Sequence, residues 1–144
     1  MESVNKDSLH NLYKNVHVAL ESISYVSKEA EDVKMKEELA HQYENYEAYA
    51  GKLAKEMLSR GEEPKEPNFF KKAMLWSSIK MNTLTDGSKS HVADMMIQGT
   101  TMGLNEVMTL LSQSGKIMDD EIRRLAEELR DLESSHLERL KAYL

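Results

Sequence analysis

The stretch Ser90–Ser112, SHVADMMIQGTTMGLNEVMTLLS, decides the predicted fold because it is the least polar long run in the chain. Two stripes run along it at helical spacing. One contains Ala93, Ile97, Thr101, Leu104, Met108 and Leu111, and the other contains Val92, Met96, Gly99, Gly103, Glu106 and Leu110. A surface helix is apolar on one stripe only, whereas a helix that is apolar nearly all round is covered on every side. We therefore expect this helix at the centre of the molecule or between two copies of it.

The residues after this stretch predict a partner helix. The central helix is expected to stop near Gly115, and the next one to begin at Asp119. Its inward stripe consists of Ile122, Leu125, Leu129, Leu132, His136, Leu140 and Tyr143. Because a short connection makes antiparallel neighbours, residues 90–144 are expected to form an antiparallel hairpin.

Residues 7–60 predict a second hairpin of the same kind. Asp7 or Ser8 can cap a first helix, which ends before the polar residues Lys28–Asp32. The following helix runs from about Val33 to Ser59. Gly61 is the expected glycine after its C-terminus, and the prolines just beyond it prevent the helix from continuing.

A crossover over residues 61–89 joins the two hairpins and carries a short helix of its own, from Phe69 to about Met81. Two hairpins linked by one long crossover are typical of ferritin-like bundles. The predicted fold is therefore all-α, a ferritin-like four-helix bundle in which residues 1–144 form a single domain.

The composition limits the possible functions. A chain of 144 residues with 40% hydrophobic and 31% charged residues has the composition of one globular domain. A formal charge of -6 argues against a nucleic-acid surface, and the absence of cysteine excludes thiol chemistry and disulfides. No run approaches the roughly 18 apolar residues that cross a membrane, and the N-terminal residues lack the apolar segment of a signal peptide. A cytoplasmic location is the expectation.

The segment Leu75–Gly103 resembles small uncharacterised bacterial ferritin-like proteins and, more distantly, rubrerythrin. The resemblance rests on Trp76, Ile79-Lys80 and Leu84-Thr85, followed by a helix with Gly99 in the middle of one face. It implies a four-helix bundle that can hold two metal ions. Such sites take a Glu from each of two helices and a Glu-x-x-His pair from each of the other two.

Two segments match the Glu-x-x-His spacing. In Glu38–His41 the histidine projects away from the apolar face, whereas in Glu133–His136 the histidine lies in the middle of it. The other ligands of a di-iron site are missing. Ile97 and Thr100 stand where relatives tend to carry carboxylates. Glu21 lies off the apolar face of its helix, and Glu106 is expected nearer the opposite end of the bundle from His136. A complete di-iron site is therefore not expected.

Glu133 and His136 have two possible roles. They can form half of a metal site, in which a single zinc or iron ion would recruit Glu47 or His17 as a further ligand. Alternatively, His136 is a buried imidazole that a neighbouring polar side chain satisfies. The candidates for that neighbour are Gln42, Tyr43, Glu47 and His17.

The leading functional prediction is a protein without enzymatic activity or cofactor, which forms a homodimer through its apolar third helix. A metal protein that uses Glu133 and His136, either an oxidase or ferroxidase or a single-ion binder, is the alternative. A third reading is a small-molecule binder with a cavity lined by Tyr43, Tyr46, Met96 and Trp76.

Overall fold

The computed structural model describes residues 2–64 and 88–144. These residues form four α-helices and no strands: α1 (Glu2–Glu29), α2 (Val33–Ser59), α4 (Lys89–Ser114) and α5 (Asp120–Lys141). The prediction of an all-α chain with four long helices is confirmed. The short helix predicted from Phe69 to Met81 lies outside the described residues, as does Trp76, on which two of the predictions depend.

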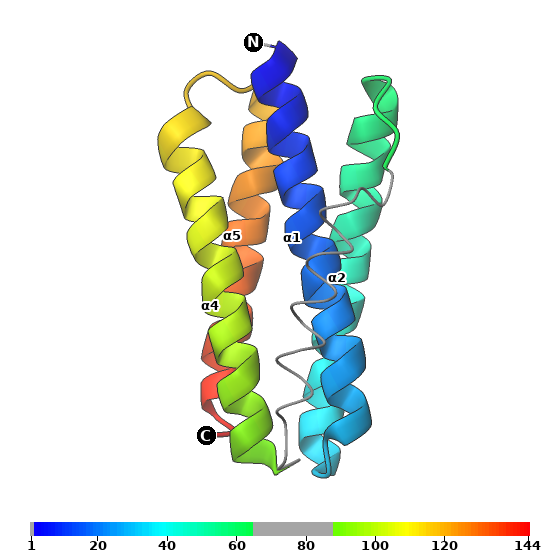
Figure 1. The fold of residues 1–144 in the computed structure, drawn as a ribbon, viewed down its shortest axis with the longest axis vertical. Coiled ribbons are helices and arrows are strands. Elements are labelled where there is room, and N and C mark those ends of the chain that lie inside the picture. The colour runs from blue at the N-terminus through cyan, green and yellow to red at the C-terminus, as the bar shows by residue number, and fades with distance from the viewer. Residues whose placement is uncertain (1, 65–87) are drawn as a thin grey trace.

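The helices are arranged as a bundle (Figure 1). Residues 30–32 join α1 to α2 at the lower end of this view, and residues 115–119 join α4 to α5 at the upper end. The N-terminus lies at the upper end and the C-terminus at the lower end. The most extensive packing is between α4 and α5 and between α1 and α2, and α1 also packs along α4.

Local sequence signals account for the ends of α2. Asp32 precedes the helix in an extended conformation, and its carboxylate accepts a hydrogen bond from the backbone N–H of Met35 at 2.9 Å. At the other end, Gly61 has a φ of 76°, and the N–H groups of Gly61 and Glu62 donate to Leu58 and Met57. This pattern is the Schellman motif, which favours glycine at the left-handed position.

The start of α5 depends on residues far away in the sequence. Asp119 precedes the helix but makes no side-chain cap. Its carboxylate instead accepts a hydrogen bond from Arg60 at 2.7 Å, and its backbone N–H donates to the side-chain oxygen of Asn5 at 2.9 Å. Asn5 belongs to the first turns of α1, which begins at Glu2 rather than at the predicted Asp7 or Ser8.

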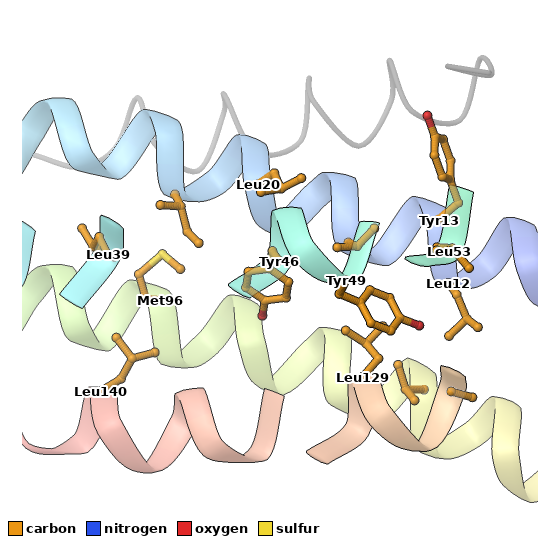
Figure 2. Close-up of a cluster of buried hydrophobic side chains, with 14 of the residues drawn as sticks. Leu12, Tyr13, Leu20, Leu39, Tyr46, Tyr49, Leu53, Met96, Leu129 and Leu140 are labelled. Atoms are coloured by element: carbon orange, nitrogen blue, oxygen red, sulfur yellow. The ribbon is translucent and has the colours of Figure 1, made fainter. Parts of the chain in front are cut away.

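The core receives side chains from all four helices (Figure 2). It contains Leu12 and Leu20 of α1, Leu39, Tyr46, Tyr49 and Leu53 of α2, Met96 of α4, and Leu129 and Leu140 of α5. Figure 2 also shows that the two buried tyrosines extend from α2 into this cluster. Each carries a hydroxyl that needs a hydrogen-bond partner inside the bundle.

The helix α4 lies at the surface of the single chain rather than at its centre, which corrects one of the two positions expected for it. Its buried residues are Val92, Ala93, Met96, Thr100 and Val107. They form one face, which falls between the two predicted stripes, so each stripe is partly exposed. Met102 and Met108 are 50% and 51% exposed. The other expected position, between two copies, stays a prediction.

Within the two described segments, no helix is long and apolar enough to cross a membrane.

Candidate functional site: a polar cluster in the bundle core

Polar side chains from α1, α2 and α5 meet in the middle of the apolar core. Asn15, Gln42, Glu133 and His136 are all buried, and Glu133 and His136 are each only 1% exposed. Together with Tyr46 and the half-buried Asn45 we call them the core cluster. Buried polar groups are costly unless they are hydrogen-bonded, so each contact in the cluster matters for stability.

The carboxyl group of Glu133 is held between three helices. The hydroxyl of Tyr46 on α2 donates to Glu133 Oε2 at 3.0 Å. The amide of Asn15 on α1 donates to the backbone oxygen of Gly103 on α4 at 2.8 Å. A Cβ atom at Gly103 would lie 2.9 Å from Glu133 Oε2 and 3.0 Å from Asn15 Oδ1, closer than real Cβ contacts. Gly103 is therefore required for the close approach of α4 to the cluster.

Burial sets the charge of Glu133. Removal from water raises the pKa of this carboxyl, as does the nearby carboxylate of Glu106, whereas hydrogen bonds to Tyr46 and Asn15 oppose the rise. The net result is a pKa of about 8. The pKa of Tyr46 is also raised well above its usual value of 10, first by burial and then by Glu133. Both groups are consequently neutral at pH 7.

His136 is also neutral. Burial lowers the pKa of its imidazole to about 4, although the charge of Glu38 acts in the opposite direction. Its Nε2 lies 3.2 Å from the amide nitrogen of Asn45, and its ring meets that of Tyr46 edge-on with centroids 4.8 Å apart. With the Asn45 amide in this orientation, Nε2 accepts and Nδ1 carries the ring proton.

Three buried atoms of the cluster have no hydrogen-bond partner among the described residues: Gln42 Oε1, Glu133 Oε1 and His136 Nδ1. An unpaired buried donor or acceptor costs about 1–3 kcal/mol, so each of these three atoms weakens the core cluster. Unpaired atoms in a polar interior are also the atoms to which a water molecule or an ion could bind.

An ion pair between a buried carboxylate and a half-exposed guanidinium adjoins the cluster. Arg139 on α5 donates to both carboxylate oxygens of Glu38 on α2, at 2.8 to 3.1 Å. Gln42 donates to the same carboxylate at 2.9 Å. Burial raises the pKa of Glu38, but the hydrogen bonds from Arg139 and Gln42 outweigh this effect and leave the pKa lowered. Glu38 is thus ionised, in contrast to Glu133.

The four predicted metal ligands are not gathered around one point. Glu133 and His136 lie in the core, but Glu47 is exposed on α2. His17 is half-buried on α1, with its ring 4.2 Å from that of Tyr13. Nowhere in residues 2–64 and 88–144 do three His, Asp or Glu side chains come close enough to hold an ion together. Three protein ligands are usual for a catalytic zinc, so this set fits a metal poorly.

Glu106 of α4 lies beside the core cluster. Its charge acts on Glu133, and it lines a cavity of about 10 Å³ between α1 and α4 that also borders Asn11 and Asn15. These neighbours do not include His136, so the expectation that Glu106 lies nearer the opposite end of the bundle from His136 stays a prediction. The cavity has room for about one water molecule, and its amide and carboxylate groups would hydrogen-bond to it.

Sequence reasoning identified Glu133 and His136 but assigned them the wrong neighbours. Of the four expected partners of His136, Glu47 is exposed, and the hydrogen bond is made by Asn45, one turn of helix away from Gln42. The available signal was the run of polar and aromatic residues Gln42–Tyr46 on α2. It does not reveal which of them faces α5.

No family model, curated protein or solved structure matches this chain. The resemblance to ferritin-like proteins thus stays a prediction, and a function can be inferred only from the described residues.

Proposed function

We propose that this chain is a ferritin-like bundle of two antiparallel hairpins that acts by self-association, forming a homodimer through the exposed side of α4. The observation that supports the proposal most strongly is the half-exposure of Met102 and Met108 on this helix. Methionine is common at adaptable binding surfaces. We call Thr101, Met102 and Met108, all exposed and on one side of the helix, the α4 surface.

Gly99 lies at the edge of this surface, next to Met102 on the helix. A glycine inside a helix costs about 1 kcal/mol relative to alanine, so its presence needs a reason. For Gly103 the reason lies within the chain, because a Cβ would collide with Glu133 and Asn15. A Cβ at Gly99 would meet no atom of the described residues within 4 Å. Close approach of a helix from a second copy would supply the missing reason, as would packing of the Trp76 segment, which lies outside the described residues.

The test is sedimentation velocity over a series of micromolar concentrations. We expect the unchanged chain to dimerise and the double variant Met102→Glu/Met108→Glu to be monomeric, because each substitution places a charge in the contact. Leu58→Glu is the matched control, since Leu58 is exposed on α2, away from the α4 surface, and should leave the dimer intact. A monomer at every concentration would overturn the proposal.

Metal binding at Glu133 and His136 is a second candidate, favoured by the unpaired Oε1 and Nδ1 atoms of these residues. Binding at Nδ1 would require the ring proton to move to Nε2, with the Asn45 amide turned so that its oxygen accepts from Nε2. These two side chains would hold a zinc or iron ion, which would act as a Lewis acid when bound. The burial of both side chains would keep bulk water from the site. Elemental analysis of untagged protein purified without chelators tests this candidate. Metal that is lost in His136→Ala but kept in His41→Ala would support it, whereas no bound zinc or iron would reject it.

A further inference from the structure

We propose that the α1–α2 pair and the α4–α5 pair can separate, and that a second copy of this chain can supply its α4–α5 pair to the first copy's α1–α2 pair. The result would be an exchanged dimer. This mode of self-association is distinct from contact through the α4 surface, and it rests on the interface between the two pairs, which we call the seam.

Polar contacts run along the whole seam. Side-chain hydrogen bonds cross it at both ends and in the middle, and they connect Asn5 with Asp119, Asn15 with Gly103, Glu38 with Arg139, Asn45 with His136, Tyr46 with Glu133, Tyr49 with Leu125, and Lys52 with Glu128. Interfaces between separable units are more polar than the interior of a single unit. The hydrogen bonds of the seam share this feature, although the apolar core also crosses it, and the most extensive packing lies within each pair.

The middle of the seam is also incompletely satisfied. It contains the atoms Gln42 Oε1, Glu133 Oε1 and His136 Nδ1, which are unpaired within the described segments. Water would hydrogen-bond to these atoms when the pairs separate. Opening the seam therefore removes the free-energy penalty of burying them unpaired, which offsets part of the cost of opening. Opening an apolar interface of the same area would satisfy no buried polar atom, so it would lack this offset.

The partner that fits an open seam is another copy of the same chain. Two contacts across the seam require specific residues at matching positions along the helices. Arg139 must meet Glu38 with two nitrogens, and a glycine must stand at position 103, where α4 approaches Asn15 and Glu133. Only an identical α4–α5 pair presents all of them in register. Exchange of an identical element between copies is a known low-cost route to dimers.

The length of the connection permits exchange. In Figure 1, α2 ends at the upper end of the bundle and α4 begins at the lower end, so any connection between them covers the length of the bundle. The 26 residues of α4 span about 39 Å at 1.5 Å per residue. From Pro64 to Ser88 there are 88 − 64 = 24 steps, which reach at most about 80 Å. A chain of this length can join its own pair or reach that of a neighbour.

Charge reversal at the ion pair tests the proposal directly. Glu38→Arg and Arg139→Glu each place like charges across the seam in a closed chain, and both variants should be destabilised. In an exchanged heterodimer, the arginine introduced at position 38 of one copy would face the glutamate introduced at position 139 of the other. The native Glu38 and the native Arg139 would face each other across the second seam, so both ion pairs would be restored. The variants are mixed in mild denaturant, one of them isotope-labelled, and the denaturant is then removed.

Native mass spectrometry and thermal unfolding then give the result. We expect the heterodimer to exceed its statistical share and to unfold at a higher temperature than either variant alone. If a single variant does not fold, recovery of helical circular dichroism on mixing serves as the readout. Persistence of the two variants as separate species, or mixing with no gain in stability, would overturn the proposal.

Two controls separate this result from association through the α4 surface. Reversal of Glu138 and Lys141, which pair within α5, should give no preference on mixing, because exchange cannot restore a contact within one helix. Adding Met102→Glu/Met108→Glu to both seam variants should leave the complementation unchanged. Loss of complementation in that background would assign the mixing to the α4 surface instead.

Discussion

The substitution Gly103→Ala tests the geometry of the core cluster. The new Cβ would lie 2.9 Å and 3.2 Å from the two carboxylate oxygens of Glu133, and 3.0 Å from Asn15 Oδ1. Glu133 is only 1% exposed, so its carboxyl group can move only within the core. We expect it to lose the hydrogen bond from Tyr46, which leaves two buried groups unpaired and costs about 1–3 kcal/mol.

The gain in helix propensity from glycine to alanine offsets about 1 kcal/mol of that cost. The expected net effect is a loss of about 1 kcal/mol in the free energy of unfolding. Gly99→Ala is the matched control on the same helix. Its Cβ meets no described atom within 4 Å, so only the gain of up to about 1 kcal/mol remains. The two variants should therefore differ by about 2 kcal/mol.

Urea unfolding at pH 7, followed by circular dichroism, measures this difference at a low protein concentration, where self-association does not contribute. If Gly103→Ala is as stable as Gly99→Ala, the carboxyl group moves without cost. The close approach of α4 to Glu133 would then have no role in specifying the core, and the reasoning for Gly103 would be refuted.

Three other substitutions test the cluster and the end of α2. Tyr46→Phe removes the donor to Glu133 and should lower the free energy of unfolding by about 1–2 kcal/mol in urea titrations; an unchanged value would mean that this hydrogen bond contributes nothing. Glu133→Gln should abolish a fall in stability with rising pH. The unfolded chain releases this proton near pH 4.5 and the folded chain only near pH 8. Between these values the folded chain holds one more proton than the unfolded chain, so the free energy of unfolding falls as the pH rises. His136 acts oppositely, because its lowered pKa makes stability rise between about pH 4 and 6.5, so the Glu133 effect is measured cleanly between pH 6.5 and 8. A variant whose slope in that window equals that of the unchanged chain would contradict a neutral Glu133. Gly61→Ala should lower the thermal midpoint through a cost of about 1 kcal/mol, because alanine is strained at a φ of 76°, and an unaltered midpoint would argue against the Schellman motif.

The ends of α2 were predictable because the signals are local. Asp32 and Gly61 act on backbone groups within one turn, so Val33 and Ser59 follow from the sequence alone. The start of α1 was predicted too late because Asp7 and Ser8 look like caps. In the fold, Ser8 is buried within α1, and the side-chain oxygen of Asn5 accepts a hydrogen bond from the backbone N–H of Asp119.

The burial of His136 and Glu133 also follows from the apolar spacing of α5. The hydrogen-bond partners of these two residues cannot be predicted from that spacing. Whether Tyr46, Asn45 or Glu47 meets α5 depends on how α2 rotates about its axis, and the pattern of α2 permits several rotations. The exposure of α4 was missed for a similar reason, since its two weak stripes leave the buried face undetermined until α1 and α5 pack against it.

The hydrogen bond from the Asp119 N–H to Asn5 makes the beginning of α5 sensitive to the opposite end of the polypeptide. Deleting residues 1–6, or fusing a bulky tag that unwinds the first turn of α1, would remove this acceptor. The first turn of α5 would then fray, although it lies 114 residues away in sequence. Amide exchange at Asp119 and in the residues after it would accelerate, so an N-terminal tag on this protein would perturb a helix near its C-terminus.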